Sequence, residues 1–143
     1  MIKNLSILLF LIFCACCEEQ VEQCPCFSDH QNPIYKGCEP GAVYDMNDTC
    51  SVIEFYKQIF TVLKYPQEAI VDSVEGRVTI GFDIFENGTI GNFTIEQDTL
   101  GHGLAHAAIE AAKTLNDKGF CPARESCEAV VFHYILPVLF VLH

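Results

Sequence analysis

Apolar residues recur at helical spacing in the segment that begins at Ser51. Steps of three and four place them along one side of a helix: Val52, Phe55, Tyr56, Ile59, Phe60 and Leu63. Ser51 can accept an amide hydrogen bond, and Glu54 can reach back to it, as in a capping box. Tyr65 ends the helix because a residue before proline avoids the helical region, and Pro66 can start a short second helix through Val71. The pattern predicts two consecutive helices.

The period of the apolar positions then changes to two. Alternation with polar or small residues is typical of a half-buried strand, and the apolar members are Val78, Ile80, Phe82 and Ile84. Asn87-Gly88 follows, and both residues tolerate positive φ in the type I′ turn of a hairpin. Pairing across that turn sets Phe82 opposite Phe93. The same register sets Ile80 opposite Ile95 on the same face, so an antiparallel hairpin is predicted.

A further helix and a third strand follow the hairpin. Gly101-His102-Gly103 precedes an Ala-rich helical pattern with a small, flat face that suits packing on a sheet: Leu104, Ala108, Ala111, Ala112 and Leu115. Ala129 to Leu142 is a β-branched and aromatic run that predicts a strand. Pro137 cannot donate to a ladder, so this strand lies at an edge, is bulged, or breaks there. The order of elements predicts an α+β fold, a small three-stranded antiparallel sheet with helices packed on one face.

Residues 1–15 have the layout of a bacterial export signal. One positive charge, at Lys3, precedes an apolar run from Leu5 to Phe13. A membrane span needs about 20 apolar residues, so a cleaved signal is favoured over an uncleaved anchor. Phe13-Cys14-Ala15-Cys16 resembles a lipoprotein signal, in which a small residue precedes the cysteine that is cleaved and lipidated. Cys16 is the expected lipidation site, with Cys17 as the alternative. The expected location is the cell envelope, facing the periplasm and anchored by the lipid.

The net charge limits the partners. The 143 residues include 19 Asp+Glu and 8 Lys+Arg, which gives a formal net charge of −11. Because phosphate binding needs clustered lysine and arginine, we expect no nucleic-acid partner. Residues 16–50 are acidic, irregular and interrupted by proline. This composition indicates a tether between the lipid and a folded domain at residues 51–143.

Nine cysteines in an exported chain indicate disulfides, because the compartment is oxidising. Cys121 and Cys127 could close one loop, and Cys38 and Cys50 could close a second. One cysteine lies in the signal peptide and Cys16 is lipidated, so an odd number remains. At least one thiol is therefore unpaired or pairs between chains.

A metal-binding or redox site built from cysteine is the alternative interpretation. Its ligands would be Cys24, Cys26, His30, Cys38 and Cys50. Zinc sites usually present two cysteines with two to four residues between them, so that both thiolates share one turn. Cys24-Pro25-Cys26 has a single intervening residue. The spacing favours disulfides, and we expect no metal and no other cofactor.

Candidate catalytic groups do not form a set. Asp83 and Glu96 fall on the outer face of the hairpin, where charges are usually solvated. His102 and His106 are four residues apart and would share a helix face, but a HExxH zinc site needs glutamate where Gly103 stands. The sequence shows no combination of nucleophile, base and oxyanion donor. We therefore expect no enzymatic activity.

Taken in order, the motifs resemble the TonB C-terminal domain family over about residues 52–142. The matching motifs are Tyr65-Pro66-x-x-Ala69; Glu75-Gly76-Arg77-Val78-x-Ile80-x-Phe82-x-Ile84 with Asn87-Gly88-Thr89-Ile90; Leu100-Gly101-His102-Gly103-Leu104 with Ala107, Ala108 and Ala111; Phe120-x-Pro122-Ala123; and Pro137-x-x-Phe140. Each motif alone is weak, but the ordered set is specific.

The resemblance implies a binding mode. Members of the family bind outer-membrane receptors from the periplasmic side, and a receptor segment adds as a strand beside the last strand of the domain. In this chain that edge would run from Val130 to Leu136, near the Tyr65-Pro66 turn. The implied partner-binding residues are Tyr65, Pro66, Val130, Phe132, Tyr134 and Leu136. For Phe132 and Tyr134, the residue pattern leaves core and groove open.

The resemblance also implies a restricted role. Energy-transducing members carry a transmembrane helix and a Pro-rich spacer, whereas this chain has a short apolar start and six prolines. Binding to an outer-membrane TonB-dependent receptor or another envelope protein is therefore expected, rather than energy transduction. Pairing of two copies through their edge strands stays open.

Overall fold

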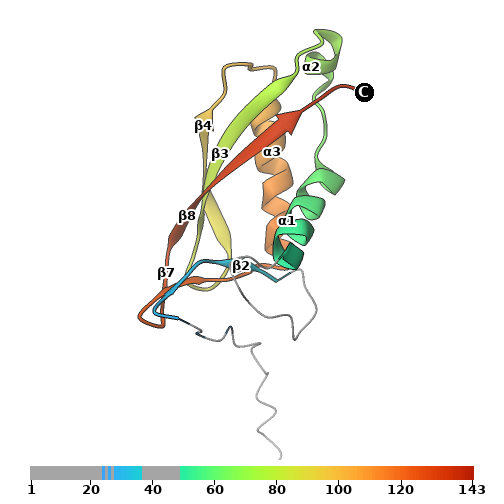
Figure 1. Cartoon of the computed structure of the whole chain (residues 1–143). Coiled ribbons are helices and arrows are strands. Elements are labelled where there is room, and N and C mark those ends of the chain that lie inside the picture. Colours follow the sequence, from blue (N-terminus) through green and yellow to red (C-terminus); the bar gives the residue numbers. More distant parts are fainter. Residues whose placement is uncertain (1–23, 25, 27, 37–48) are drawn as a thin grey trace, which may run out of the picture.

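The computed structural model describes residues 24, 26, 28–36 and 49–143. Its helices are α1 (Thr49–Val62), α2 (Gln67–Val71), α3 (Leu104–Lys113) and the 3-10 helix η1 (Thr114–Asp117). Its strands are β1 (His30–Gln31), β2 (Ile34–Tyr35), β3 (Gly76–Ile84), β4 (Ile90–Gln97), β5 (Phe120–Cys121), β6 (Ala123–Glu125), β7 (Glu128–Val130) and β8 (Phe132–Phe140). Figure 1 shows α1 and α3 beside each other behind the three long strands.

The main sheet has the order β4-β3-β8, with β3 in the centre. β3 pairs antiparallel with β8 along its whole length, from Gly76 opposite Phe140 to Ile84 opposite Phe132. Helices α1 and α3 cover one face of this sheet, and among the described elements none covers the other face (Figure 1). The predicted α+β fold is confirmed. Two smaller sheets, β1-β6-β7 and β2-β5, close one end of the domain.

The core lies between the covered face of the sheet and the two helices. Alternate residues of β3 are fully buried: Val78, Ile80, Phe82 and Ile84. Helix α3 buries mostly alanine on its inner side, and such small side chains let a helix backbone lie close to a sheet. In α1, Phe55 and Ile59 are buried, but Val52 and Phe60 of the same predicted helix side are half exposed. The apolar side of α1 is thus wider than the core that it covers.

The turn of the β3–β4 hairpin differs from the expected type. Only Gly88 has a positive φ, +80°, whereas Asn87 does not. The Phe85 amide donates to the Thr89 carbonyl at 2.8 Å, and the Gly88 amide donates to the Phe85 carbonyl at 2.9 Å. The loop therefore has three residues, a type I turn followed by a left-handed glycine. A side chain at Gly88 would also collide with the Phe120 carbonyl. Both the positive φ and this close approach therefore require glycine here.

The register of the hairpin is confirmed at one of the two predicted pairs. Ile80 lies opposite Ile95. Phe82 and Phe93 are not directly opposite, because the pairing shifts there and Asn92 adopts a φ of +50°. Their ring centroids are nevertheless 5.8 Å apart. A bulge of this kind moves the ladder by one residue and still leaves both rings on the covered face.

Part of the segment expected to be a tether belongs to the fold. β1 pairs with β6, and β2 pairs with β5 through Tyr35 opposite Phe120. Tyr35 is 3% exposed, and its ring lies 5.2 Å from Phe120 and 6.0 Å from Phe55. Strands of two residues cannot display a period, so the sequence pattern could not identify them.

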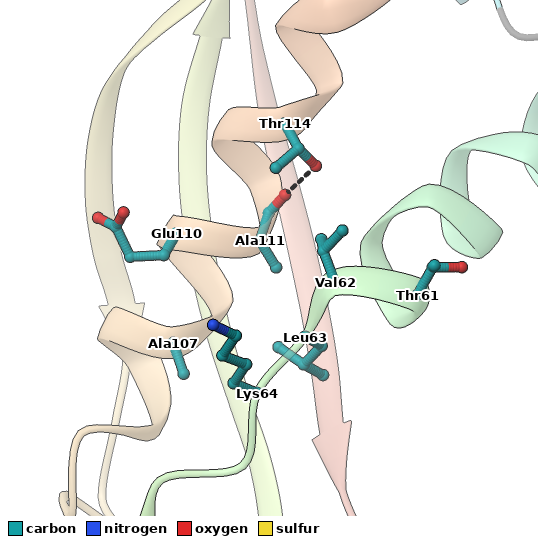
Figure 2. A pocket seen from close by; sticks show the side chains of 8 residues that line it. All are labelled: Thr61, Val62, Leu63, Lys64, Ala107, Glu110, Ala111 and Thr114. Atoms are coloured by element: carbon teal, nitrogen blue, oxygen red, sulfur yellow. Dashed lines mark hydrogen bonds between the residues drawn. The ribbon is translucent and has the colours of Figure 1, made fainter.

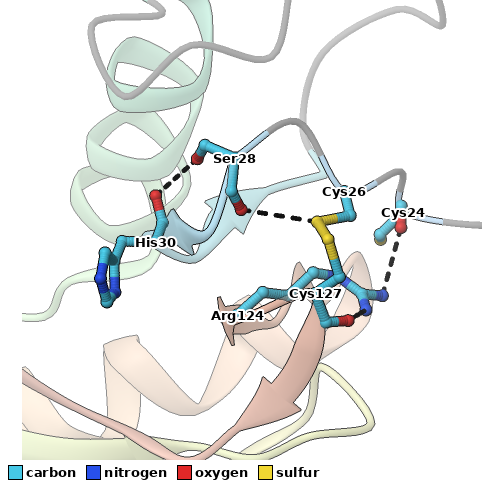
Figure 3. Close-up of a disulfide and its surroundings, with 6 residues drawn as sticks. All are labelled: Cys24, Cys26, Ser28, His30, Arg124 and Cys127. Atoms are coloured by element: carbon cyan, nitrogen blue, oxygen red, sulfur yellow. Dashed lines mark hydrogen bonds between the residues drawn. A yellow bond between two sulfur atoms is a disulfide. The ribbon is translucent and has the colours of Figure 1, made fainter.

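Two disulfides fasten this segment to the C-terminal part of the chain, Cys24–Cys121 and Cys26–Cys127. Figure 3 shows the second bond beside Arg124, whose guanidinium donates to the Cys127 carbonyl at 2.7 Å and to the Cys24 carbonyl at 3.2 Å. The prediction that Cys121 and Cys127 form disulfides is confirmed, but the prediction that they pair with each other is wrong. Pairing of β1 with β6 places Cys24 and Cys26 beside Cys121 and Cys127.

The remaining cysteine predictions are not tested by the structure. Cys16 and Cys38 lie outside the described residues, and the side chain of Cys50 is outside the described part as well. A Cys38–Cys50 bond therefore stays a prediction. Among the residues that the structure describes, no helix has both the length and the apolarity needed to cross a membrane.

Candidate functional site

The main sheet has two outer strands, β4 and β8, and each has one edge that pairs with no other described strand. β4 shows two register shifts against β3, whereas the register of β8 is regular throughout. A bulge bends an edge and interrupts the spacing of its hydrogen-bonding groups. The free edge of β8 is therefore the better template for an added strand.

Alternate residues of an antiparallel strand direct their backbone groups toward the neighbouring strand and away from it. The Phe85 amide, just beyond β3, donates to the Thr89 carbonyl, so odd-numbered residues of β3 face β4 and even-numbered ones face β8. Even-numbered residues of β3 pair with even-numbered residues of β8, which therefore face β3. Pro137 is odd-numbered, so its nitrogen points to the free edge, as expected of a residue that cannot donate to a ladder. Ile135 and Leu139, on either side of Pro137, therefore direct their amides to the free edge.

The side chains of β8 divide with the same alternation. Leu136, Val138 and Phe140 point into the core and are at most 2% exposed. Ile135 and Leu139 lie on the open face and are 48% and 55% exposed. The edge thus offers backbone groups to a partner together with apolar side chains beside them.

Tyr65 and Pro66 lie at the C-terminal end of β8. The Tyr65 hydroxyl donates to the Val74 carbonyl at 2.5 Å, and its ring lies 5.3 Å from that of Phe140. Pro66 is the N-cap residue of α2. About 13 Å of strand separates Phe140 from Leu136. The Tyr65-Pro66 turn therefore lies beside the C-terminal end of β8. The resemblance had implied a position near Val130 to Leu136.

The other predicted binding residues take three different positions. Val130 belongs to β7 and pairs with β6. Leu136 is fully buried. Tyr134 and Phe132 are half-buried at the margin of the covered face, and the Tyr134 ring stacks on Phe82 with centroids 5.4 Å apart. Burial raises the pKa of the Tyr134 hydroxyl. Tyr134 thus packs against the core and keeps one side exposed, and Phe132 is half-buried two residues before it.

Sequence reasoning did not single out Ile135 and Leu139, two residues whose amides face the free edge and whose apolar side chains are exposed. Pro137 carried the signal that could have found them. A proline in a paired strand occupies a position whose nitrogen points away from the neighbour. Residues two positions before and after it must share that direction.

A polar network crosses the open face at the N-terminal end of β8. His133 on β8 places Nδ1 2.7 Å from Asp83 on β3, and Nε2 3.7 Å from Glu96 on β4. Asn92 donates to Asp83 at 2.8 Å. These side chains lie across Gly81, where a Cβ would come within 2.9 Å of the His133 ring. Asp83 is thus engaged rather than solvated as expected, and hydrogen bonds from Asn92 and then His133 lower its pKa.

We expect Asp83 to stabilise the fold at neutral pH and to lose this effect in acid. Its folded pKa lies below its unfolded value of about 3.9, so its contribution is complete above that value and disappears as the pH falls through the folded pKa. Urea unfolding should show Asp83→Asn less stable than wild type by about 0.5–1 kcal/mol at neutral pH, with a smaller gap at about pH 3. Glu86→Gln, an exposed loop carboxylate, is the control. A gap of equal size at both pH values would contradict the prediction.

A second concave feature lies between the C-terminal end of α1 and helix α3. It is an open groove with a volume of about 780 Å³. Figure 2 shows the residues that line it: Thr61, Val62, Leu63, Lys64, Ala107, Glu110, Ala111 and Thr114. The Thr114 hydroxyl donates to the Ala111 carbonyl at 2.7 Å, and Glu110 pairs with Lys113 at 2.6 Å. These polar groups satisfy one another, so the lining offers little chemistry of its own.

The predicted histidine pair does not form. His102 precedes α3, which begins at Leu104, and its φ is +55°. Its Nδ1 lies 2.7 Å from the Leu100 carbonyl and its Nε2 lies 3.1 Å from Asp72. The expected helix face shared with His106 is therefore wrong. In the part of the chain that the structure covers, no three histidine, cysteine, aspartate or glutamate residues are placed to hold a metal ion.

Comparison with known proteins agrees with this arrangement. The chain is similar to the NMR solution structure of Helicobacter pylori TonB-CTD (residues 179-285), with a TM-score of 0.52 and 22% identity over 64% of this chain and 80% of that chain. A shorter form of that domain (residues 194-285) gives a TM-score of 0.49 and 21% identity over 63% and 91% of the two chains. Pseudomonas aeruginosa TonB CTD gives 0.43 and 20% over 55% and 77%. No curated protein matches the chain.

A family model described as Gram-negative bacterial TonB protein C-terminal matches residues 61–142. The match covers 82 of the 143 residues, which is more than half. The chain therefore belongs to the TonB C-terminal domain family and is a TonB-related protein-interaction module of the cell envelope.

Proposed function

We propose that this chain is a periplasm-facing binding module that takes up a peptide segment of an outer-membrane receptor or another envelope protein as an added strand on β8. The regular pairing of β3 with all nine residues of β8 carries the proposal. Such pairing keeps the outer edge of β8 straight and in one phase. Strand addition gains affinity from main-chain hydrogen bonds and specificity from alternate side chains.

The predicted binding residues have different parts in this proposal. Phe132 and Tyr134 present partly exposed rings next to the edge. Leu136 is buried in the core and holds the middle of β8 in place. Tyr65 positions the C-terminal half of β8 through its contact with Phe140. Val130 lies in β7 of a neighbouring sheet, where it pairs with Ala123 of β6.

The function proposed here is binding and not catalysis. Asp83, Glu96 and His133, titratable side chains near the edge, interact with one another, and strand addition itself needs only backbone groups. A cysteine-based metal or redox site is disfavoured because the sulfurs of Cys24 and Cys26 are already bonded to other cysteines.

We also propose that a lipid on Cys16 holds the module at a membrane. The support is the export signal in residues 1–15 and the small residue before Cys16. Intact mass of the protein from its native membranes should show a chain that begins at Cys16 with a diacyl or triacyl adduct. A chain that retains Met1 without an adduct would contradict the anchor and leave strand addition untouched.

We expect Ile135→Pro to weaken partner binding by about 10- to 100-fold. The substitution removes an amide directed to the free edge and leaves a carbonyl of the added segment without a donor. Pro137 shows that β8 tolerates proline at positions of this phase. The full chain would be tested by interferometry against synthetic peptides that cover the periplasm-facing segments of the receptors of the same cell.

Ile135→Thr is the matched control, because it changes the same side chain and keeps the amide. It should bind within about threefold of wild type. Thermal unfolding of both variants checks that the fold is intact. Equal binding by Ile135→Pro and wild type would show that the peptide binds elsewhere.

A further inference from the structure

Helix α1 carries an apolar surface that the core does not use. Val52, Tyr56 and Phe60 follow at steps of four, so they form one line along the helix. Val52 is 50% exposed and Phe60 is 52% exposed. The rings of Tyr56 and Phe60 stack, with centroids 6.1 Å apart and an interplanar angle of 17°. These three side chains are hereafter called the α1 stripe.

The α1 stripe lies on the side of α1 that is turned away from α3. Gln58 donates to Thr114 at 3.3 Å, which marks the side that faces α3 and η1. Phe55 points into the core and is 4% exposed. At about 100° per residue, Tyr56 and Phe60 lie beyond Phe55 and opposite Gln58.

β8 is the strand next to this side of α1. Helix α3 contacts β3 and β4. By contrast, the Phe55 ring of α1 lies 5.5 Å from Tyr134 of β8. The pKa of Tyr134 is raised by burial and further by the nearby Tyr56 hydroxyl, so both tyrosines are at one margin of the core. The α1 stripe and the free edge of β8 thus border the same strip of surface.

A strand added to β8 would lie about 4.8 Å beyond it and point alternate side chains to opposite faces. Side chains on the helix side would meet Tyr134 and the Tyr56–Phe60 pair. Side chains on the open side would meet Ile135 and Leu139. Both surfaces are apolar, so the strip fits a segment that is apolar on both faces.

The charged side chains near β8 limit which peptide segments can bind beside it. The chain carries a net charge of −11, and Asp83 and Glu96 lie at one end of β8 on the open face. On α1, Lys57 is already paired with Glu54 at 3.0 Å. An acidic side chain beside Asp83 and Glu96 would be repelled, whereas a neutral or basic one would not. At the other end of β8 the exposed Arg77 lies opposite Leu139 and would accept an acidic side chain.

We propose that the free edge of β8 and the α1 stripe form one groove for an extended apolar segment of a partner protein. The segment has no acidic residue at the end that lies beside Asp83 and Glu96, and it seats a large, preferably aromatic, side chain on the Tyr56–Phe60 pair. This inference rests on the proposed strand addition and specifies the chemistry of the segment that is bound.

The test uses two synthetic peptides and the full, disulfide-bonded chain. In the first peptide valine and phenylalanine alternate over about ten residues, with lysine at both ends for solubility. In the second, serine replaces each phenylalanine. Fluorescence anisotropy should show that wild type prefers the phenylalanine peptide by about tenfold or more, because an aromatic contact is lost in the other. Equal binding of the two peptides would overturn the proposal.

Phe60→Ser should reduce that preference to about threefold or less. Val71→Ser is the matched control, since Val71 is an apolar residue of α2 that is 71% exposed. It should keep the full preference. If Phe60→Ser also keeps it, the α1 stripe is not the site of recognition.

Ile135→Pro separates this inference from the proposed function. It should lower the binding of both peptides. If it does so while Phe60→Ser keeps the preference, strand addition stands and the α1 stripe is excluded. If neither variant lowers binding, both proposals fail. If the chain alone sediments as a dimer that Phe60→Ser dissociates and the peptide does not compete, the occupant is a second copy and the peptide inference is overturned.

Discussion

Replacing Cys24 and Cys26 together with serine is expected to lower the free energy of unfolding by about 3–5 kcal/mol. The two disulfides join residues that are 97 and 101 positions apart. Each therefore closes a loop that contains nearly all of the described fold, and long loops restrict the unfolded chain most. The two loops almost coincide, so the second bond adds less than the first. Urea unfolding followed by far-UV circular dichroism measures the difference.

Reduced wild-type protein is the control for this double variant. It should unfold at the same urea concentration as the variant, because both lack the same two bonds. The variant should also expose Tyr35 more readily, since β1 and β2 would lose their covalent links to the C-terminal part of the chain. A variant as stable as oxidised wild type would contradict the prediction.

Phe82→Ala is expected to cost about 3–5 kcal/mol of stability, as other large-to-small changes at buried phenylalanines do. Phe82 is fully buried in the central strand. Its ring lies 5.4 Å from Tyr134 and 5.8 Å from Phe93, so its removal leaves a cavity between all three strands of the main sheet. Thermal or urea unfolding gives the value.

Phe82→Leu is the matched control, because it keeps most of the volume and should cost clearly less than Phe82→Ala. Tyr134 loses its support in the alanine variant, so peptide binding to β8 should weaken in the same variant even where it remains folded. A loss of stability below about 1 kcal/mol would mean that neighbouring side chains collapse into the space.

The elements that depend on local chemistry could be predicted from the sequence. The period of two in β3 and the Asn87-Gly88 pair act over a few residues, so the hairpin was within reach of pattern analysis. The end of the first helix before Pro66 is local in the same way, because proline restricts its own neighbour. The Ala-rich pattern identified α3 and its start at Leu104. The helix face assigned to His102 and His106 was wrong, because His102 lies before the helix with a positive φ.

The disulfide pairing could not be predicted in this way. Which cysteine meets Cys121 depends on β1 and β2 docking on β6 and β5, and strands of two residues carry no periodic signal. Spacing alone favoured Cys127 as the partner because it is near in sequence. The two bonds instead join parts of the chain that only the folded arrangement brings together.

The candidate site was predictable as a strand but not as a set of exposed residues. The family resemblance pointed to Phe132, Tyr134 and Leu136, which share the covered face of the sheet. Ile135 and Leu139 lie between and beyond them, with both amide and side chain accessible. A motif that matches residue types does not by itself state the parity of a strand, although Pro137 indicates it and the pairing with β3 sets it.

Pro137 affects how the protein behaves at high local concentration. An open edge flanked by apolar side chains is the kind that recruits identical copies into stacked cross-β fibrils. Growth of such a stack requires each strand to donate and accept hydrogen bonds on both sides without a gap. Pro137 has no amide proton, so one hydrogen-bond donor is absent from the middle of the free edge of β8. A second copy of β8 paired along the whole edge would meet this gap, whereas a short segment bound before or after Pro137 would not. The same residue thus allows an edge to remain open for a partner while it hinders polymerisation.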